Sequence, residues 1–133
     1  MTDNEVTLPT DRLPVIRVVA MPKDTNPGGS IFGGWLMSQI DIAAAIPALE
    51  RARGRVATVA VNSMEFHEPV FVGDVVSCYA DIIKTGRTSI TVKVEVFSER
   101  NPADKKIVKV TEAELIYVAL DENRKPRVLP DID

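Results

Sequence analysis

Residues 35–52 combine a helical pattern with apolar side chains on nearly every face. A helix of this kind is stable only where it is buried nearly all round. Cationic Arg51 and Arg53, followed by Gly54, are typical of a last helical turn and its stop. Pro47 removes a backbone donor and predicts a kink one turn earlier. The apolar residues are Leu36, Met37, Ile40, Ile42, Ala43, Ala44, Ala45, Ile46, Ala48 and Leu49.

The rest of the chain supplies strands that could enclose this helix. Residues 89–96 alternate polar and apolar side chains with a period of two, the cleanest half-buried strand pattern in the sequence. Residues 15–21, 55–66, 74–84 and 106–120 are further strand candidates, and residues 84–87 and 99–105 carry turn signals. The sequence therefore predicts an α+β fold in which a strongly curved antiparallel sheet wraps a long central helix.

Two segments are predicted to be irregular. Residues 22–34 hold four glycines and two prolines, a composition that suits tight backbone geometry and a functional loop. Residues 1–14 show no period, which predicts a flexible N-terminal arm before a single domain over residues 15–133.

Composition excludes several functional classes. The formal net charge is -3, with 16 basic and 19 acidic residues spread along the chain, so nucleic acid is not an expected partner. No apolar run approaches the ~20 residues that span a bilayer, so no membrane association is expected. The single cysteine, Cys78, has no partner for a disulfide within the chain, which favours a core position and a cytoplasmic protein. One histidine and one cysteine predict no metal site.

Asp41 is the residue most suggestive of chemistry, because it is the only ionisable group between Trp35 and Leu49. A carboxylate isolated in apolar surroundings costs several kcal/mol or titrates near neutrality, as general bases and nucleophiles do. Alternatively, Asp41 points into a solvent-filled groove or caps a neighbouring loop. His67, the only histidine, is expected to be a surface residue, since spacing identifies no partner for it.

Gly33 and Gly34 begin the predicted helix, where backbone N–H groups have no intrahelical acceptor. Gly34 shares a helix face with Asp41, two turns away, so both could border one pocket. Unshielded N–H groups could bind a carbonyl oxygen as it becomes an oxyanion. Alternatively, the two glycines only allow tight packing.

Several segments together resemble the hotdog-fold acyl-CoA thioesterases, within them the bacterial YciA type. The resemblance covers residues 18–130. Its motifs are Ala20-Met21-Pro22, Asp24-Thr25-Asn26, Ile31-Phe32-Gly33-Gly34-Trp35, Met37-Ser38-Gln39, Asp41, Gly54-Arg55-Val56, Pro69-Val70, Val72-Gly73-Asp74-Val75-Val76, Lys125-Pro126-Arg127 and Leu129-Pro130.

The resemblance implies a hotdog fold, dimers with a continuous sheet, and commonly a trimer of such dimers. It implies hydrolysis of acyl-CoA to a carboxylic acid and CoA at sites between protomers. There Asp41 of one subunit would work opposite Asn26 of another, with the amides of Gly33 and Gly34 polarising the thioester carbonyl. Direct attack by Asp41 and activation of water both remain open. No cofactor is implied, since coenzyme A is part of the substrate.

Binding of coenzyme A requires cationic side chains near its phosphates. The resemblance places Arg87 and Thr88 at a phosphate-contacting turn, with Arg127 as a further candidate. The chain departs from the family at Ser30, where relatives usually carry an acid, and at Pro47, where most have no proline. The first departure is expected to alter the loop or its charge. The second is expected to bend the later half of the helix and so to change the shape of the tunnel that holds the acyl chain in the family.

Two other functions fit a chain of this type. A hotdog hydratase or dehydratase usually relies on a histidine with an acid, and the predicted loop and helix contain no histidine. A non-catalytic acyl-CoA sensor would need an output module, and no second domain of sufficient size fits in 133 residues.

Overall fold

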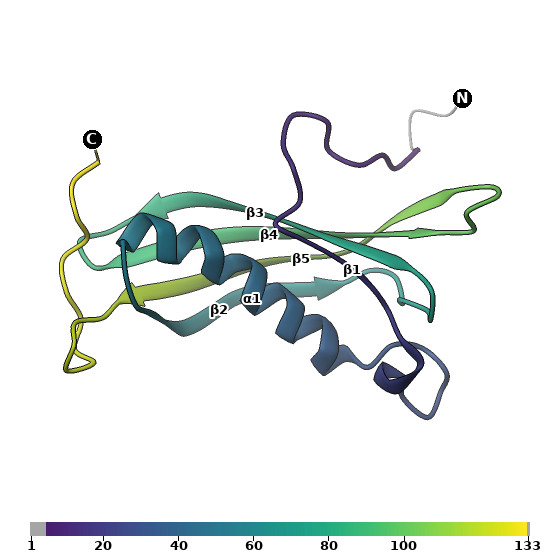
Figure 1. The fold of residues 1–133 in the computed structure, drawn as a ribbon, viewed down its shortest axis with the longest axis horizontal. Helices are drawn as coiled ribbons and strands as arrows, with labels where there is room; N and C mark the ends of the chain where they lie inside the picture. The colour runs from purple at the N-terminus through teal and green to yellow at the C-terminus, as the bar shows by residue number, and fades with distance from the viewer. Residues whose placement is uncertain (1–4, 133) are drawn as a thin grey trace.

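The computed structural model describes residues 5–132, which contain one long helix and five strands. Strand β1 (Ile16–Val19) and the 3-10 turn η1 (Pro22–Asp24) precede helix α1 (Gly33–Ala52). Strands β2 (Val56–Phe66), β3 (Val75–Thr85), β4 (Ser89–Arg100) and β5 (Lys106–Ala119) follow. All strand pairs are antiparallel, in the order β1-β3-β4-β5-β2 (Figure 1). The predicted α+β hotdog architecture is confirmed.

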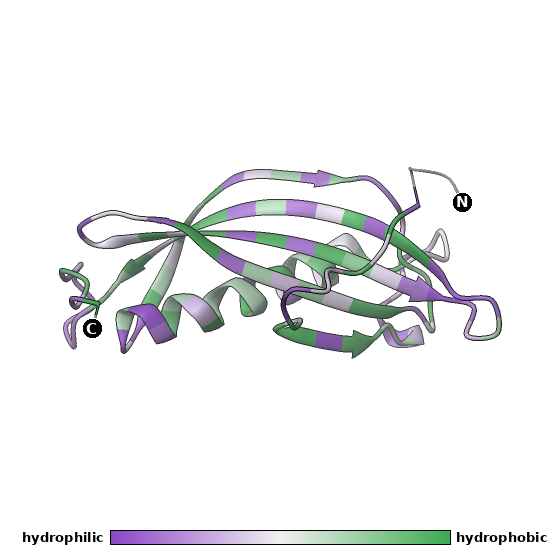
Figure 2. Ribbon diagram, turned by 90° about the horizontal axis from the view of Figure 1, so that it is seen from above, coloured by the Kyte–Doolittle hydropathy of each residue, from purple (hydrophilic) through white to green (hydrophobic). Residues whose placement is uncertain are grey.

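The sheet curves over one side of α1 (Figure 2). Small side chains of the helix face the sheet, so that helix and sheet approach closely, and the valines of β4 fill the centre of the core. The fully buried residues of these two elements are Ile40, Ala43, Ala44, Ala48, Ala52, Ile90, Val92, Val94 and Val96.

The expectation that α1 is buried nearly all round is wrong for the single chain. The sheet covers only the side with the small residues, and the opposite side carries large apolar residues that are 37–53% exposed. Edge strand β2 adds Val61, which is 47% exposed. We refer to these residues as the open face, which comprises Met37, Ile42, Ile46, Leu49 and Val61.

Helix α1 continues through Pro47 to Ala52 as one element, so the proline does not end the helix. Strand β4 is longer than the alternating pattern of residues 89–96 indicates. A register shift between Val96 and Phe97 inserts an irregularity in its pairing with β5, after which Phe97, Ser98 and Glu99 are all buried. The extra residue of this irregularity, Val110, belongs to β5, so β4 continues past it without ending.

Residues 5–14 form no regular element, and those of the predicted arm before them, 1–4, lie outside the described residues. Arg12 attaches this segment to the sheet surface opposite α1: it pairs with Glu95 and Asp81, and its guanidinium lies 5.4 Å from the centre of the Tyr79 ring. Lys109 also binds Glu95 there, at 2.9 Å. We refer to this surface, made by Arg12, Tyr79, Asp81, Glu95 and Lys109, as the arm face.

Cys78 lies in β3 with its side chain in the core, fully buried and without a disulfide, as predicted. Burial raises the pKa of the Cys78 thiol to about 12. The thiol is therefore protonated and shielded in the folded protein.

Candidate active site

Asp41 lies in the third turn of α1, and the structure corrects the expectation that its carboxylate is isolated. Two hydroxyl groups donate to its Oδ1 atom: the Tyr117 phenol at 2.5 Å and the Thr58 hydroxyl at 2.8 Å. The phenol oxygen also lies 2.9 Å from the main-chain carbonyl oxygen of Asp41. A buried or half-buried carboxylate is stabilised by such donors.

Asp41 borders a groove of about 260 Å³ between α1 and the sheet. Apart from Asp41, its lining residues are Met37, Ser38, Thr58, Val61, Met64 and Leu115. Four of these six side chains are apolar, so the groove places a carboxylate and two hydroxyls beside a hydrocarbon-like surface. The groove is open to solvent at the exposed residues Thr58 and Val61, so a solvent-facing position and a reactive role are compatible for Asp41.

Tyr117 reaches Asp41 from β5, where alternate residues face the helix. Its side chain is 1% exposed. Burial and the neighbouring Asp41 carboxylate raise the pKa of the Tyr117 phenol, which therefore remains a hydrogen-bond donor at neutral pH. This residue was not identified from the sequence. The available signal was a phenol oxygen among mainly apolar inward residues of β5, because a buried tyrosine hydroxyl needs a partner.

Thr58 reaches Asp41 from the edge strand β2, and it too was missed. The pairing of β2 with β5 shifts register between Thr58 and Ala60, and again between Val61 and Ser63. These irregularities change which β2 side chains face the helix, so alternation within the sequence does not identify Thr58 as an inward residue.

Gly33 and Gly34 are the first two residues of α1, as expected for oxyanion donors. Within residues 5–132 no acceptor is bound by either N–H group, whereas the next amide, of Trp35, donates to Phe32. A Cβ atom on Gly34 would lie 2.6 Å from Cε1 of Phe32, while one on Gly33 would meet no atom within 4 Å. Both glycines are exposed, so their amides are accessible to a ligand.

In the single chain, Gly33 does not line the groove at Asp41. It borders a second hollow, together with Ile31, Leu36, Phe66, His67, Glu68, Pro69 and Val70. His67 is exposed, as expected, and its Nε2 atom lies 3.9 Å from Glu65. The helix start and the carboxylate are about 10 Å apart along the axis, given seven residues at 1.5 Å each.

Asn26 lies in the loop before α1, where it is held by Ser30. The Asn26 side-chain amide donates to the Ser30 hydroxyl at 3.1 Å, and its Oδ1 accepts the Ser30 N–H at 3.2 Å. The Asn26 N–H donates to the Ser30 carbonyl at 2.8 Å, and Gly29, with a φ of 96°, makes the turn. No contact between Asn26 and Asp41 occurs within the described part of the chain.

The residues expected to contact coenzyme A differ in whether other groups of the chain already bind their side chains. Arg87 is exposed at the β3–β4 turn, and Thr88 follows it, with its carbonyl bound by the Ala119 N–H. Arg127 instead donates to two main-chain carbonyls, of Leu120 and of Ala52 at the end of α1, both at 2.8 Å. Arg127 therefore stabilises the helix end, a role that the sequence did not indicate.

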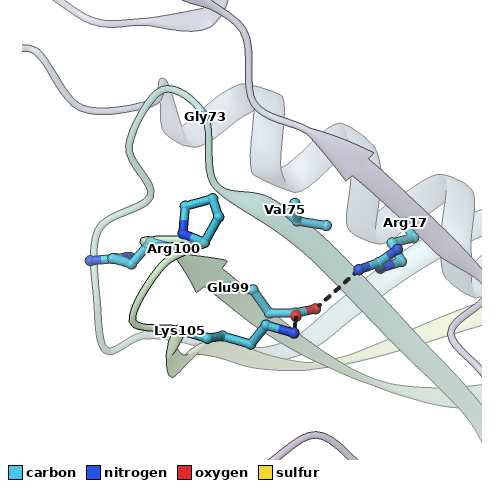
Figure 3. Close-up of a pocket in the computed structure, with 7 residues that line it drawn as sticks. Arg17, Gly73, Val75, Glu99, Arg100 and Lys105 are labelled. Atoms are coloured by element: carbon cyan, nitrogen blue, oxygen red, sulfur yellow. Dashed lines mark ion pairs between the residues drawn. The ribbon is translucent and has the colours of Figure 1, made fainter.

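A third hollow holds mainly charged residues of β1, β4 and the loop after β4 (Figure 3). Its Glu99 is 6% exposed and pairs with Arg17 at 3.6 Å and with Lys105 at 3.3 Å. The lining residues are Arg17, Gly73, Val75, Glu99, Arg100, Pro102 and Lys105. Because Arg17 and Lys105 of the same chain pair with the Glu99 carboxylate, we interpret this cluster as a structural ion-pair network.

Neither a candidate metal site nor a helix that could cross a membrane occurs among residues 5–132. No group of three histidine, cysteine, aspartate or glutamate side chains there could hold a metal ion. No helix in the same range has the length and apolarity needed to cross a membrane.

Comparison with known proteins places this geometry in a family. The model of the thioesterase superfamily matches residues 28–103. The acyl-CoA thioester hydrolase YciA of Escherichia coli is 52% identical over 118 residues, which cover 87% of this chain and 89% of that protein.

Solved structures agree with this match. The hexameric thioesterase of Yersinia pestis is 54% identical, with a TM-score of 0.85, over 94% of this chain and all of that one. A hexameric hotdog-fold thioesterase of Campylobacter jejuni is 42% identical, with a TM-score of 0.87, over 92% of this chain and 93% of that one.

An acyl-CoA hydrolase of Staphylococcus aureus is more distant. The wild-type enzyme was solved with butyryl coenzyme A, and is 31% identical, with a TM-score of 0.80, over 89% of this chain and 71% of that one. Two of its variants were also solved, one with an asparagine and one with an aspartate replaced by alanine. From the family model, the identities and the shared fold, the chain belongs to the hotdog thioesterase superfamily, and within it to the acyl-CoA thioester hydrolases of the YciA type.

Proposed function

We propose that the protein hydrolyses acyl-CoA thioesters with Asp41 as its catalytic carboxylate. The observation that carries this proposal is a carboxylate held by Thr58 and Tyr117 beside an apolar groove, in a chain that belongs to a thioesterase family. The groove suits an acyl chain, and Asp41 lies where the thioester at the end of that chain would meet it.

Two routes use the same carboxylate. As a general base, Asp41 takes a proton from water while the water oxygen attacks the thioester carbonyl; the C–S bond then breaks, and the proton passes to the departing thiolate of coenzyme A. As a nucleophile, Asp41 attacks the carbonyl carbon, the C–S bond breaks, and the thiolate of coenzyme A leaves a mixed anhydride behind. Water then hydrolyses the anhydride, which releases the carboxylic acid, restores the Asp41 carboxylate and supplies the proton that the thiolate takes up. Both routes yield a carboxylic acid and coenzyme A, and neither requires a cofactor.

In both routes the carbonyl oxygen becomes negative, and we assign its stabilisation to the N–H groups of Gly33 and Gly34 together with Asn26. Unpaired amides at a helix start are suited to a developing oxyanion. Asn26 would come from a second copy of the chain. In support, the two residues replaced in the Staphylococcus aureus variants are an asparagine and an aspartate 15 positions apart, as are Asn26 and Asp41.

Self-association is part of this proposal. The open face exposes large apolar side chains that the single chain does not cover, and such surfaces mark protein interfaces. We propose a dimer with a continuous sheet and a trimer of such dimers, which accords with the hexameric state of the Yersinia pestis and Campylobacter jejuni thioesterases.

For the coenzyme A phosphates we propose Arg87 and Thr88, because the Arg87 side chain is exposed. Arg127 is the weaker candidate of the set, since two main-chain carbonyls already occupy its guanidinium. We place the reaction in the cytoplasm, the compartment in which an unpaired cysteine such as Cys78 is usual.

Thiol release from acyl-CoA by purified Asp41→Asn tests the proposal. The asparagine Oδ1 can still accept from Thr58 and Tyr117, so the fold should be retained, while turnover should fall by about 100-fold or more, as expected for loss of an acid–base group. Circular dichroism and thermal unfolding provide the control. Near-wild-type turnover of a correctly folded variant would refute the role of Asp41, and binding of acyl-CoA by the wild type without hydrolysis would indicate a sensor.

Mixing two inactive variants tests the contribution of Asn26 from another copy. After subunit exchange between Asn26→Ala and Asp41→Ala proteins, hybrid dimers would contain one intact composite site and one site lacking both groups. Activity should return to part of the wild-type level. If exchange is demonstrated by mass spectrometry and no activity returns, the two residues do not act together across an interface.

A further inference from the structure

Both hydroxyl groups that reach Asp41 donate to the same carboxylate oxygen. Tyr117 and Thr58 bind Oδ1 at 2.5 and 2.8 Å, and within residues 5–132 no hydrogen bond reaches Oδ2. A carboxylate oxygen has two lone pairs in its plane, so two donors satisfy Oδ1. The other oxygen retains both lone pairs.

The geometry points to Oδ2 as the atom of Asp41 that acts on water or on the thioester, and to Tyr117 as the positioning residue that fixes it. This inference rests on the proposed function and deepens it, because it assigns the reacting atom and names a residue on which turnover depends without touching the substrate.

Tyr117 is better placed than Thr58 to set the orientation of the carboxylate. Its ring is packed in the core and 1% exposed, whereas Thr58 is exposed on an edge strand. The phenol has one O–H proton, which it donates to Oδ1 at 2.5 Å, the shorter of its two contacts with Asp41. The buried ring thus holds Oδ1 in one place and restricts the side-chain rotamer of Asp41.

Orientation of this kind affects turnover more than binding. A carboxylate free to rotate would present either oxygen, in several directions, and reactions between held groups are sensitive to displacements of about 1 Å. The acyl chain and coenzyme A bind elsewhere in the groove and on the surface, so their affinity should be little changed.

The two tyrosines of the chain provide a matched pair of variants. Tyr117→Phe removes the hydroxyl that holds Asp41, and Tyr79→Phe removes the hydroxyl of an equally buried tyrosine, 3% exposed, on the arm face. A hydrogen bond to a charged group corresponds to about a 10- to 100-fold effect on a rate. We expect kcat of Tyr117→Phe to fall within that range with KM nearly unchanged, and Tyr79→Phe to retain wild-type kcat.

Wild-type kcat in folded Tyr117→Phe, or an equal loss of kcat in Tyr79→Phe, would overturn the inference. Asp41→Asn measured alongside separates this failure from failure of the proposed function: an inactive Asp41→Asn with a fully active Tyr117→Phe refutes only the positioning role. If Tyr117→Phe does not fold, Thr58→Val and Thr58→Ser replace it. Loss of kcat in the valine variant and its recovery in the serine variant would support Oδ1 as the anchored oxygen, and equal activity in both would overturn the part of the inference that rests on two donors at Oδ1.

Discussion

The open face and the arm face lie on opposite sides of the same sheet–helix sandwich, and they are completed in different ways. On the arm face, each charged group meets a partner from the same chain: Arg12 pairs with Asp81 and Glu95, and Lys109 pairs with Glu95. On the open face, large apolar side chains such as Ile42, 53% exposed, have no cover within the described chain.

This difference indicates that the arm face is stabilised within one chain, whereas the open face is suited to contact with another molecule. Intrachain ion pairs make the arm face self-sufficient, while the open face has hydrophobic area that only another molecule can remove from water. Asp41 lies on the border of that incomplete surface. The proposed site therefore lies beside the surface that we propose to be an interface, and substitutions on the two faces compare them directly.

The largest effect is expected from a charge on the open face. Leu49→Lys places a cation among Ile42 and Ile46, where it would oppose burial against another chain, and a cation near a helix C-terminus leaves the helix itself stable. We expect a smaller assembly in sedimentation equilibrium and a loss of turnover of about tenfold or more, as for a central interface residue.

The matched control is Leu13→Lys. Leu13 lies in the N-terminal segment and is 86% exposed, so the same substitution should alter neither the assembly nor the turnover. If both variants retain the wild-type mass, the open face is not an interface between copies of this chain, and the composite site proposed for Asn26 and Asp41 loses its structural basis.

Substitutions at two glycines are expected to have effects of intermediate size. Gly34→Ala would bring a methyl group beside the helix-start amides and against Phe32, lowering kcat by about tenfold through loss of oxyanion stabilisation, with little change in thermal stability. Gly73, at a turn beside β3, has a φ of 89°, so Gly73→Ala should cost about 1 kcal/mol of stability and leave kcat unchanged. Steady-state kinetics and thermal unfolding separate the two. An effect of Gly34→Ala on KM alone would contradict the oxyanion assignment.

The smallest effect is expected on the arm face. Burial alone would raise the pKa of Glu95, but hydrogen bonds from Lys109 and Arg12 outweigh it and hold that pKa below its usual value of 4.5. The stabilisation from these bonds is therefore complete above pH 4.5 and is lost as the pH falls through the lowered pKa of the folded state.

Arg12→Ala tests this linkage. We expect the free energy of unfolding to fall by at most about 1 kcal/mol at pH 7, as for partly exposed ion pairs, with turnover unchanged. The difference from the wild type should shrink as the pH falls below 4.5 and through the lowered pKa of Glu95, because the wild type then loses the same contribution. Urea unfolding at pH 7 and at successively lower pH values measures this difference, and a difference that grows in acid would show that the ion pair is not its cause.

Regular elements were predictable from the sequence because their patterns are local. The helix begins two residues before the predicted Trp35 and ends at the predicted Ala52, and the strands lie within a few residues of their expected positions. The prediction was weakest where pairing is irregular, as at Val96 and Phe97, because a bulge depends on the neighbouring strand.

The site was predictable only in part. Asp41 was identifiable because its charge interrupts an apolar helix, but its partners Thr58 and Tyr117 are 17 and 76 positions away and look like ordinary strand residues. Ser30 was noted as a departure from the family, yet its bond to the Asn26 amide depends on the turn between them. The surroundings of α1 were misjudged because the sequence pattern does not distinguish burial within a chain from burial between chains.

The buried thiol of Cys78 makes the protein convenient to measure. Its only thiol is protonated and out of contact with solvent, so a coloured disulfide reagent added to detect released coenzyme A should not react with the folded enzyme. Nor should product thiols or their disulfides exchange with it. Conversely, Cys78 becomes reactive only when the core around β3 opens. In the absence of substrate, the rate at which the reagent labels Cys78 therefore measures how often the folded protein opens. When substrate is present, the same reagent measures turnover.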